Sequence, residues 1–321
     1  MGTLIIWIVV GFLLANIAFY VFMIVYASHQ IYTLTLKRQS GEHWGREVSS
    51  QDPPQLEMDA IGMEWQREHD AYRRDVHIFH NNANLYGEYY DFGSDKAVII
   101  LSGRTESLRY GYYFSKPYAD AGLNVLVVDP RSHGLSDGTF NTVGFEESKD
   151  ALAWARFLHD THHVKAVVFH GICIGGAAGM LGITADDCPD YVVGLVTEGM
   201  FSRFAESMKN HLIERKKHFP FLLTAIDAWM KHFTGHSMMK GPVNVIHRMN
   251  KPLLMIQSKM DPYSTPQNAK LLYELCPSKE KKIVWYEKGG HSLLRLTDTE
   301  TYDREITLFL ERVFEPALSQ R

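Results

Sequence analysis

The segment VVFHGICIGGAAG (Val167–Gly179) has the pattern of a strand that runs through a tight turn into a helix. Its first half is an apolar run, typical of a strand buried on both faces of a parallel sheet. Its second half is rich in glycine and alanine and suits the start of a closely packed helix. Gly171 and Gly175 flank the turn between the two halves, and Cys173 stands at the tip. A sharp strand-to-helix turn of this kind strains the backbone of the tip residue and exposes its side chain.

Other apolar runs alternate with helical patterns on both sides of this segment. We expect a hairpin over 75–92 and buried strands over 96–102, 124–129, 165–170, 191–199, 252–258 and 281–287. Helical patterns cover 64–74, 113–122, 145–160 and 301–314. Strands that alternate with helices predict an α/β fold, with a mostly parallel central sheet flanked by helices. Ligands of such sheets bind beyond the carboxyl ends of the strands.

The alternation is interrupted once, by a segment rich in aromatic residues and methionine over 200–248. This segment predicts a helical cap of two or three helices. We therefore expect an α/β core over 76–199 and 249–318, preceded by a linker and a lead-in helix over 28–75.

The N-terminal stretch from Leu4 to Tyr26 contains no charged residue. A helix needs about 20 such residues to cross a bilayer core of about 30 Å, so we predict a transmembrane helix over 4–27. A cleavable signal peptide is the alternative, but this run is longer than the usual apolar region of one and no basic residue precedes it. Lys37, Arg38 and Arg46 follow the span, which favours a single-pass protein whose body lies in the cytoplasm.

Composition excludes several classes of protein. Of the 321 residues, 45% are hydrophobic and 22% charged, as in ordinary globular proteins, and the net charge of -4 argues against nucleic acid as a partner. The 3 cysteines, Cys173, Cys188 and Cys276, form no C-x-x-C pair, so neither a disulfide framework nor a structural metal site is expected. The sequence carries no signal for an oligomeric state.

Two residues downstream of Cys173 complete a pattern of nucleophilic catalysis. Asp261 follows the strand expected over 252–258, and His291 follows the strand expected over 281–287. His291 would accept the thiol proton and later protonate the leaving group, and Asp261 would orient its ring. Cys173 alone would equally suit a small buried core residue. The downstream acid and histidine, in the order nucleophile, acid, histidine, favour catalysis.

Glu198 is an alternative acid, because it ends the strand that follows the cysteine-bearing helix. We favour Asp261, whose loop contains an Asp-Pro pair and Pro266, which shape the usual acid turn.

An oxyanion would be bound by two backbone N–H groups, those of Ile174 and Arg104. Ile174 directly follows the cysteine, and Arg104 lies in the loop after the strand over 96–102. The Arg104 side chain could meet an anionic substrate, but we expect it to face solvent.

The segment DPRSHGLSDG (Asp129–Gly138) combines Asp, Arg and His in a glycine-rich loop. We interpret it as a structural turn, in which Asp129 and Arg131 hold the loop beside the cysteine-bearing helix. His133 is therefore not our candidate for the general base.

Taken together, the segment SGRTESLRYGYYFSKPYADAGLNVLVVDPRSHGLSDG, the G-x-C-x-G turn, DPYSTPQNAKLLYE and GGHSLL resemble the α/β-hydrolase superfamily. The chain is most similar to bacterial membrane-anchored hydrolases of the lysophospholipase and monoglyceride-lipase (serine-aminopeptidase) type, over about residues 65 to 315. This resemblance implies that Cys173 is the nucleophile, Asp261 the acid and His291 the base. It also implies ester or related acyl hydrolysis without a metal or an organic cofactor.

The sequence departs from that family at two positions. Cys173 stands where serine is usual, as in dienelactone hydrolases and polyhydroxyalkanoate synthases, and Ser102 precedes Gly103 where the family has His-Gly. Thiolate is a good leaving group, so sulfur favours esters and thioesters over amides. We expect a hydrolase of esters or thioesters that forms a covalent acyl-enzyme. The alternatives are an acyltransferase, a lactone hydrolase, or a catalytically silent anchored binding protein.

The cap indicates the kind of substrate. Its apolar side chains either line an acyl-binding cleft or pack the cap on the core, and its segment ERKKHF adds positive charge. Near a bilayer each such basic residue attracts anionic headgroups by about 1 kcal/mol. With the membrane helix, these features predict a small-molecule acyl or lipid-like substrate.

Overall fold

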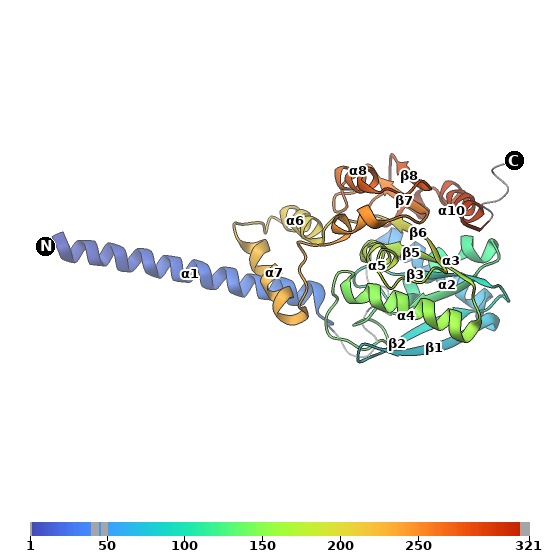
Figure 1. Cartoon of the computed structure of the whole chain (residues 1–321). Coiled ribbons are helices and arrows are strands. Elements are labelled where there is room, and N and C mark those ends of the chain that lie inside the picture. The colour runs from blue at the N-terminus through green and yellow to red at the C-terminus, as the bar shows by residue number, and fades with distance from the viewer. Residues whose placement is uncertain (1, 40–44, 46–50, 315–321) are drawn as a thin grey trace.

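The structure is a computed structural model that describes residues 2–39, 45 and 51–314. One long helix, α1 (Gly2–Leu36), projects from an α/β body, and its N-terminal end lies far from that body (Figure 1). Among the described residues, α1 is the helix that is long and apolar enough to cross a membrane. Arg46 and residues 315–318, to which the predictions above extend, lie outside the described residues.

The body is built on one eight-stranded sheet in the order β1-β2-β4-β3-β5-β6-β7-β8. The hairpin of β1 and β2 is antiparallel and pairs with β4 in the same sense, whereas all the other neighbours are parallel. This arrangement confirms the predicted fold class. The strands are β1 (Arg73–His80), β2 (Ala83–Tyr90), β3 (Lys96–Leu101), β4 (Asn124–Val128), β5 (Ala166–Ile172), β6 (Val192–Glu198), β7 (Leu253–Ser258) and β8 (Lys281–Tyr286).

Helices cover both faces of the sheet because the central strands are apolar on both sides. One apolar core joins the sheet to α4, α5 and α8, and a second joins its other face to α2, α3 and α10. These helices are α2 (Pro53–Glu68), α3 (Leu108–Asp120), α4 (Phe145–His162), α5 (Ile174–Ile183), α8 (Pro266–Leu275) and α10 (Thr299–Phe314), with the short α9 (Leu294–Thr297) before α10. The parallel strands end on the side from which α1 projects. The candidate residues Cys173, Asp261 and His291 follow the ends of β5, β7 and β8.

The lead-in helix differs from its prediction over 64–74. It begins earlier, at Pro53 of α2, and ends at Glu68, after which a single 3-10 turn η1 (Asp70–Tyr72) leads directly into β1. Proline at the first helical position favours this earlier start, since its missing N–H and fixed φ suit a helix N-terminus.

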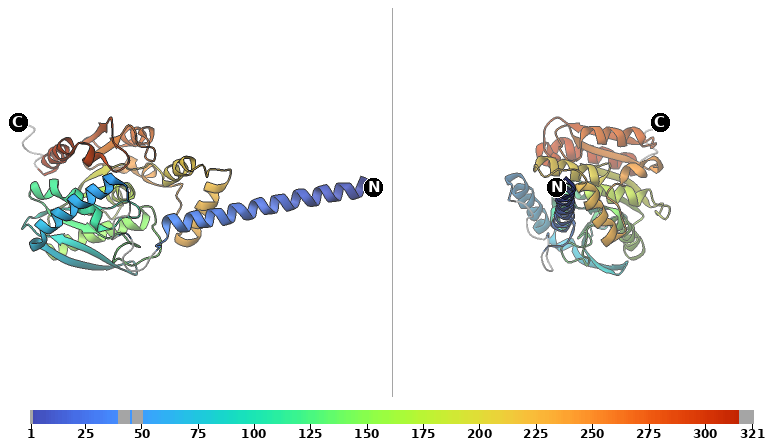
Figure 2. Two further views of the ribbon diagram at one scale, coloured as in Figure 1. Left: turned by 180° about the vertical axis from the view of Figure 1, so that it is seen from behind. Right: turned by 90° about the vertical axis from the view of Figure 1, so that its left-hand side faces the viewer.

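The cap lies between β6 and β7. It consists of α6 (Phe204–Glu214), α7 (Leu222–Thr234) and two 3-10 turns, η2 (Pro242–Asn244) and η3 (Ile246–Arg248). Both helices lie at the end of the body from which α1 projects, as the views from behind and end-on also show (Figure 2). The segment thus contains two α-helices, where the sequence predicts two or three.

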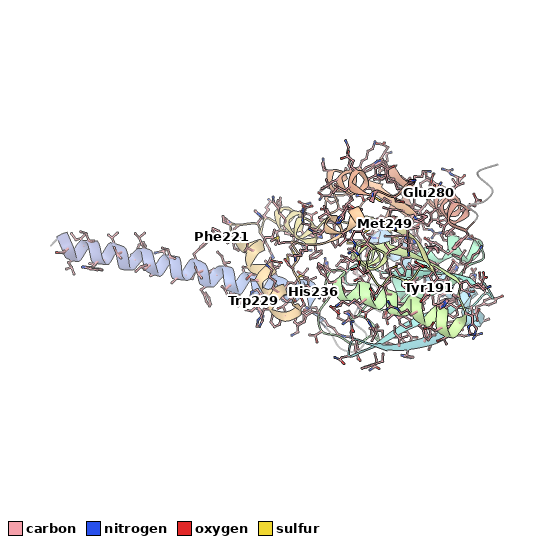
Figure 3. The ribbon with its side chains drawn as sticks, viewed as in Figure 1. Tyr191, Phe221, Trp229, His236, Met249 and Glu280 are labelled. Atoms are coloured by element: carbon pink, nitrogen blue, oxygen red, sulfur yellow. The ribbon has the colours of Figure 1, made fainter. Side chains whose placement is uncertain are left out.

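The linker expected from residue 28 onward begins instead as the continuation of α1, which packs against α7. Trp229 donates a hydrogen bond from Nε1 to the Ser28 hydroxyl at 3.1 Å, and it lies where the two helices cross (Figure 3). The Tyr32 ring stacks on Phe233 with centroids 5.7 Å apart, and Leu36 is fully buried. The last turns of α1 are thus docked on the cap.

Candidate active site

The turn between β5 and α5 holds Cys173 in a strained conformation. Its φ of 51° and ψ of -107° lie in a region that side-chain-bearing residues rarely adopt. A Cβ on Gly171 would lie 2.3 Å from the carbonyl carbon of Gly175, and one on Gly175 would lie 1.9 Å from the carbonyl oxygen of Leu101. Both positions therefore require glycine. The turn presents the partly exposed Cys173 thiol beyond the end of the strand.

Asp261 and His291 lie within hydrogen-bonding distance of each other. Asp261 Oδ2 lies 2.7 Å from His291 Nδ1, and Oδ1 accepts hydrogen bonds from the backbone N–H groups of Tyr263 at 2.8 Å and Ser264 at 2.9 Å. The Asp261 side chain is 1% exposed. These donors stabilise a buried carboxylate. Because Asp261 contacts Nδ1 of His291, Nε2 of the ring is left to face another group.

His291 is held between two acidic groups. Burial alone would lower its pKa, but the charge of the Cys173 thiolate, with hydrogen bonds to Asp261 and to Cys173, outweighs burial and raises the pKa well above its ordinary value. The side chain is 18% exposed, so these interactions are only partly screened by solvent. Asp261 thus contacts His291, and His291 and the Cys173 thiol line one cavity.

Glu198 does not form a hydrogen bond to His291 in the structure. Its carboxylate is buried and accepts hydrogen bonds from Leu294 N–H at 2.9 Å and from the Tyr302 hydroxyl at 2.8 Å. Burial raises its pKa. Because Leu294 lies three residues after His291, Glu198 holds the loop that carries the histidine rather than the ring itself.

The two candidate oxyanion donors lie on either side of the cysteine. Ile174 is the first residue of α5, where backbone N–H groups have no partner inside the helix. Arg104 follows Gly103, on which a Cβ would lie 3.8 Å from Cys173 Cβ. The N–H groups of a helix N-terminus and an adjacent loop are the elements that stabilise an oxyanion.

His133 supports this loop, a contact that the sequence did not indicate. Its Nε2 accepts a hydrogen bond from Thr105 N–H at 3.2 Å, and its Nδ1 lies 3.0 Å from the carbonyl oxygen of Arg131. Burial lowers its pKa to about 4, so the ring is neutral at physiological pH. His133 therefore acts as a neutral bridge between loops, in agreement with its exclusion as the general base.

The rest of the segment from Asp129 to Gly138 is structural, as predicted. Asp129 accepts hydrogen bonds from Leu108 N–H at 2.9 Å and Leu135 N–H at 2.8 Å, and Arg131 pairs with Asp150 of α4 at 2.6 Å. Asp129 thereby ties the start of α3 to the turn that follows β4.

A cavity of about 320 Å³ opens over the thiol. It is lined by residues of the core and the cap, among them Arg104, Cys173, Phe204, His211, Arg215 and His291. The expectation that the Arg104 side chain faces solvent is wrong: it lines this cavity, and its Nη1 donates to the carbonyl oxygen of Thr35 in α1 at 3.4 Å. The docked end of α1 draws the side chain inward by supplying that acceptor.

The sequence is similar to two proteins of uncharacterized function. No family model matches the chain. It is 28% identical to the uncharacterized protein YqkD of Bacillus subtilis over 220 residues, which cover 67% of this chain and 71% of that protein. It is 23% identical to the uncharacterized membrane protein YNL320W of Saccharomyces cerevisiae over 200 residues, or 62% of this chain and 66% of the yeast protein.

Solved structures similar to this one include esterases and hydrolases. The Pyrococcus furiosus esterase Pf2001 has a TM-score of 0.65 and 22% identity, over 77% of this chain and 94% of its own. Mouse alpha/beta hydrolase domain-containing protein 10 has a TM-score of 0.55 and 15% identity, over 74% of this chain and 99% of its own. The sheet order, the strained turn after β5 and these neighbours together identify the fold of the chain as the α/β-hydrolase fold.

Proposed function

We propose that the protein is a membrane-anchored hydrolase of carboxylic esters or thioesters that uses Cys173, His291 and Asp261 as its catalytic triad. The observation that carries the proposal is the contact of Asp261 with His291 Nδ1 at 2.7 Å, with His291 and Cys173 lining the same cavity. The esterases among the similar folds support the reaction type.

Acyl transfer to sulfur would begin with loss of the thiol proton. His291 Nε2 accepts this proton, and the Cys173 thiolate attacks the carbonyl carbon of the substrate, whose π electrons move to oxygen. The N–H groups of Ile174 and Arg104 stabilise the oxyanion. Collapse of the tetrahedral intermediate breaks the bond to the leaving group, which takes the proton from His291.

Hydrolysis of the acyl-enzyme then returns the thiol. His291, now neutral, takes a proton from water as the water oxygen attacks the thioester carbonyl. The second tetrahedral intermediate expels the Cys173 thiolate, which recovers the proton from the imidazolium, and the carboxylic acid leaves. Asp261 keeps Nδ1 protonated throughout, so that Nε2 faces the reacting atoms.

The anchoring part of the proposal rests on the length of bare helix. The side chains of residues 2–23 in α1 are exposed, and packing on the body begins at Ile24. At 1.5 Å per residue these residues extend about 33 Å, which matches a bilayer core of about 30 Å. We propose that the body lies on the cytoplasmic side, where Lys37 and Arg38 follow the span.

A profile of acyl substrates tests the function. Esters and thioesters of short and long acyl chains are assayed with the full-length protein in detergent, together with Cys173→Ala and Cys173→Ser. We expect Cys173→Ala to abolish turnover and a thiol-reactive acyl probe to label Cys173 before Cys188 or Cys276, whose pKa values burial raises. Undiminished hydrolysis by Cys173→Ala, or equal labelling of the three cysteines, would refute the proposal.

A further inference from the structure

The cavity over Cys173 continues toward the membrane helix. A second cavity of about 240 Å³ shares four lining residues with the first: Arg104, Phe204, His211 and Arg215. Its far wall is formed by Ile31, Leu34 and Thr35 of α1. The two cavities together, called the cleft below, therefore lead from the thiol to the end of the membrane helix.

The junction of the two cavities is basic. Arg104 and Arg215 line both parts of the cleft, and Lys217 lines the part next to α1. Glu106 is the acidic residue among those that line the cleft, and it lies in the part near Cys173. Glu214, next to Arg215 in sequence, accepts the Tyr263 hydroxyl hydrogen at 2.6 Å. Positive charge therefore exceeds negative charge at the junction.

Arg104 is held there without a carboxylate partner. Within the described part of the chain it forms no ion pair, and its side chain donates a hydrogen bond to the carbonyl oxygen of Thr35. Burial lowers its pKa and repulsion from Arg215 adds to that shift, while the Cys173 thiolate and Glu106 oppose it. An anion bound between Arg104 and Arg215 would offset both the burial of the Arg104 charge and the repulsion between the two guanidinium groups.

The wall of the cleft beyond the arginines is apolar. Met208 and Leu212 of α6 face this part, opposite Ile31 and Leu34 of α1, and Leu34 is 65% exposed. The cleft thus combines a basic junction near the thiol with an apolar wall on the helix that enters the bilayer. That combination fits a molecule with a charged head and a hydrocarbon chain.

From these observations we infer that the substrate is an anionic amphiphile, whose phosphate or carboxylate pairs with Arg104 and Arg215 beside Cys173 while its chain lies along α1. This inference rests on the proposed function for the reaction, but not for the binding. Arg215 and Arg104 are then specificity-determining residues, and the substrate reaches the thiol from the membrane surface along Ile31 and Leu34.

Binding to a protein without the thiol tests the inference apart from catalysis. Dodecyl phosphate and inorganic phosphate are titrated by calorimetry into full-length Cys173→Ala in micelles of a neutral detergent. Arg104→Gln and Arg215→Gln are added to this background, with Lys209→Gln as the matched control, since Lys209 is exposed on α6 away from the cleft. Arg215 is also exposed, so its variant keeps the test valid if Arg104→Gln does not fold.

We expect dodecyl phosphate to bind more tightly than inorganic phosphate by about tenfold or more, because only the former reaches the apolar wall. Each arginine variant should lower the affinity for dodecyl phosphate by about tenfold or more, because a charge-assisted contact is lost. Lys209→Gln should change this affinity by less than about twofold. Equal binding by the arginine variants and the lysine control would overturn the anion site. Equal affinity for dodecyl phosphate and inorganic phosphate would overturn the inference that the ligand is an amphiphile.

A kinetic comparison extends the test to active protein. The ratio of kcat/KM for a 1-acylglycerol phosphate to that for the 1-acylglycerol of the same chain should exceed about tenfold and fall in Arg215→Gln. If neither ester is hydrolysed but dodecyl phosphate still binds through the arginines, the proposed function fails while the anion site stands. Hydrolysis of both esters at equal rates would instead refute the anionic specificity alone.

Discussion

Replacement of Asp261 by asparagine separates the orientation of His291 from the packing of its loop. The amide is nearly the same size as the carboxylate, and its oxygen can still accept hydrogen bonds from Tyr263 N–H and Ser264 N–H, now 2.8 and 2.9 Å from Oδ1. Its NH₂ group then takes the place of Oδ2, 2.7 Å from His291 Nδ1. His291 must accept at Nδ1 and carry its proton on Nε2, so it can no longer take the thiol proton.

The size of the effect follows from what is lost. A charge-assisted hydrogen bond contributes about 1.5 to 3 kcal/mol, and the attraction between carboxylate and imidazolium adds a few more at a partly screened site. We expect kcat/KM to fall by about 10²- to 10⁴-fold, or roughly 3 to 5 kcal/mol of transition-state stabilisation. The KM should change little, because Asp261 does not line the cavity.

Alkylation of Cys173 gives an assay that needs no known substrate. The rate with iodoacetamide is measured from about pH 5 to pH 9 for the wild type and for Asp261→Asn. The Asp261 carboxylate helps to raise the His291 pKa, so its loss destabilises the imidazolium that faces the thiolate. The half-maximal rate should therefore move to higher pH in the variant.

Glu198→Gln is the matched control for this experiment. It neutralises a second buried carboxylate near His291 and keeps an oxygen acceptor for Leu294 N–H, while its NH₂ group replaces Oε2 and can donate to the Tyr302 hydroxyl oxygen. We expect its kcat/KM to fall by about tenfold or less, with the alkylation profile near that of the wild type. A larger loss in Glu198→Gln than in Asp261→Asn would refute the assignment of Asp261 and favour Glu198 as the acid.

Three further outcomes follow from the packing and charge of the molecule. Tyr32→Ala removes a fully buried ring and should lower the free energy of unfolding by about 3 kcal/mol or more. Amide hydrogen exchange across Leu222–Thr234 should then speed up, whereas Tyr20→Ala, in the bare part of α1, should leave it unchanged. Burial lowers the pKa of His170 to about 3, so this residue contributes stability above about pH 6.5 that is lost as pH falls. Denaturant titration should show about 3 kcal/mol of this loss by about pH 4.5, and His170→Gln should make the free energy of unfolding depend less on pH. His133→Ala should lower kcat by about 10- to 100-fold with little change in KM, because it frees the loop that carries one oxyanion donor; a rise in KM with constant kcat would contradict that role.

The sheet and the order of the site residues were predictable from the sequence because they depend on local pattern. The apolar runs of β3, β5 and β7 are buried on both faces, and such runs cannot be stable elsewhere in a folded domain. Cys173 and Asp261 follow the buried strands β5 and β7, His291 follows the partly buried edge strand β8, and the parallel topology brings the ends of these strands to one edge.

The docking of α1 and the inward turn of Arg104 could not be predicted in the same way. Both depend on partners far along the chain: Tyr32 is buried by Phe233 of the cap, and Arg104 finds its acceptor on Thr35. The segment after residue 27 is polar enough to suit a linker when its partner is unknown. Periodicity describes one element at a time, whereas these contacts join three elements.

The site of acylation shows whether the sulfur of Cys173 is the nucleophile. Full-length protein is mixed with an activated thioester, quenched in acid and digested, and the peptides are weighed by mass spectrometry. We expect an added acyl mass on the peptide that carries Cys173, which builds up in His291→Ala only slowly and never in Cys173→Ala. Turnover of the thioester with no acyl mass at Cys173, or with equal acylation of Cys188, would contradict it.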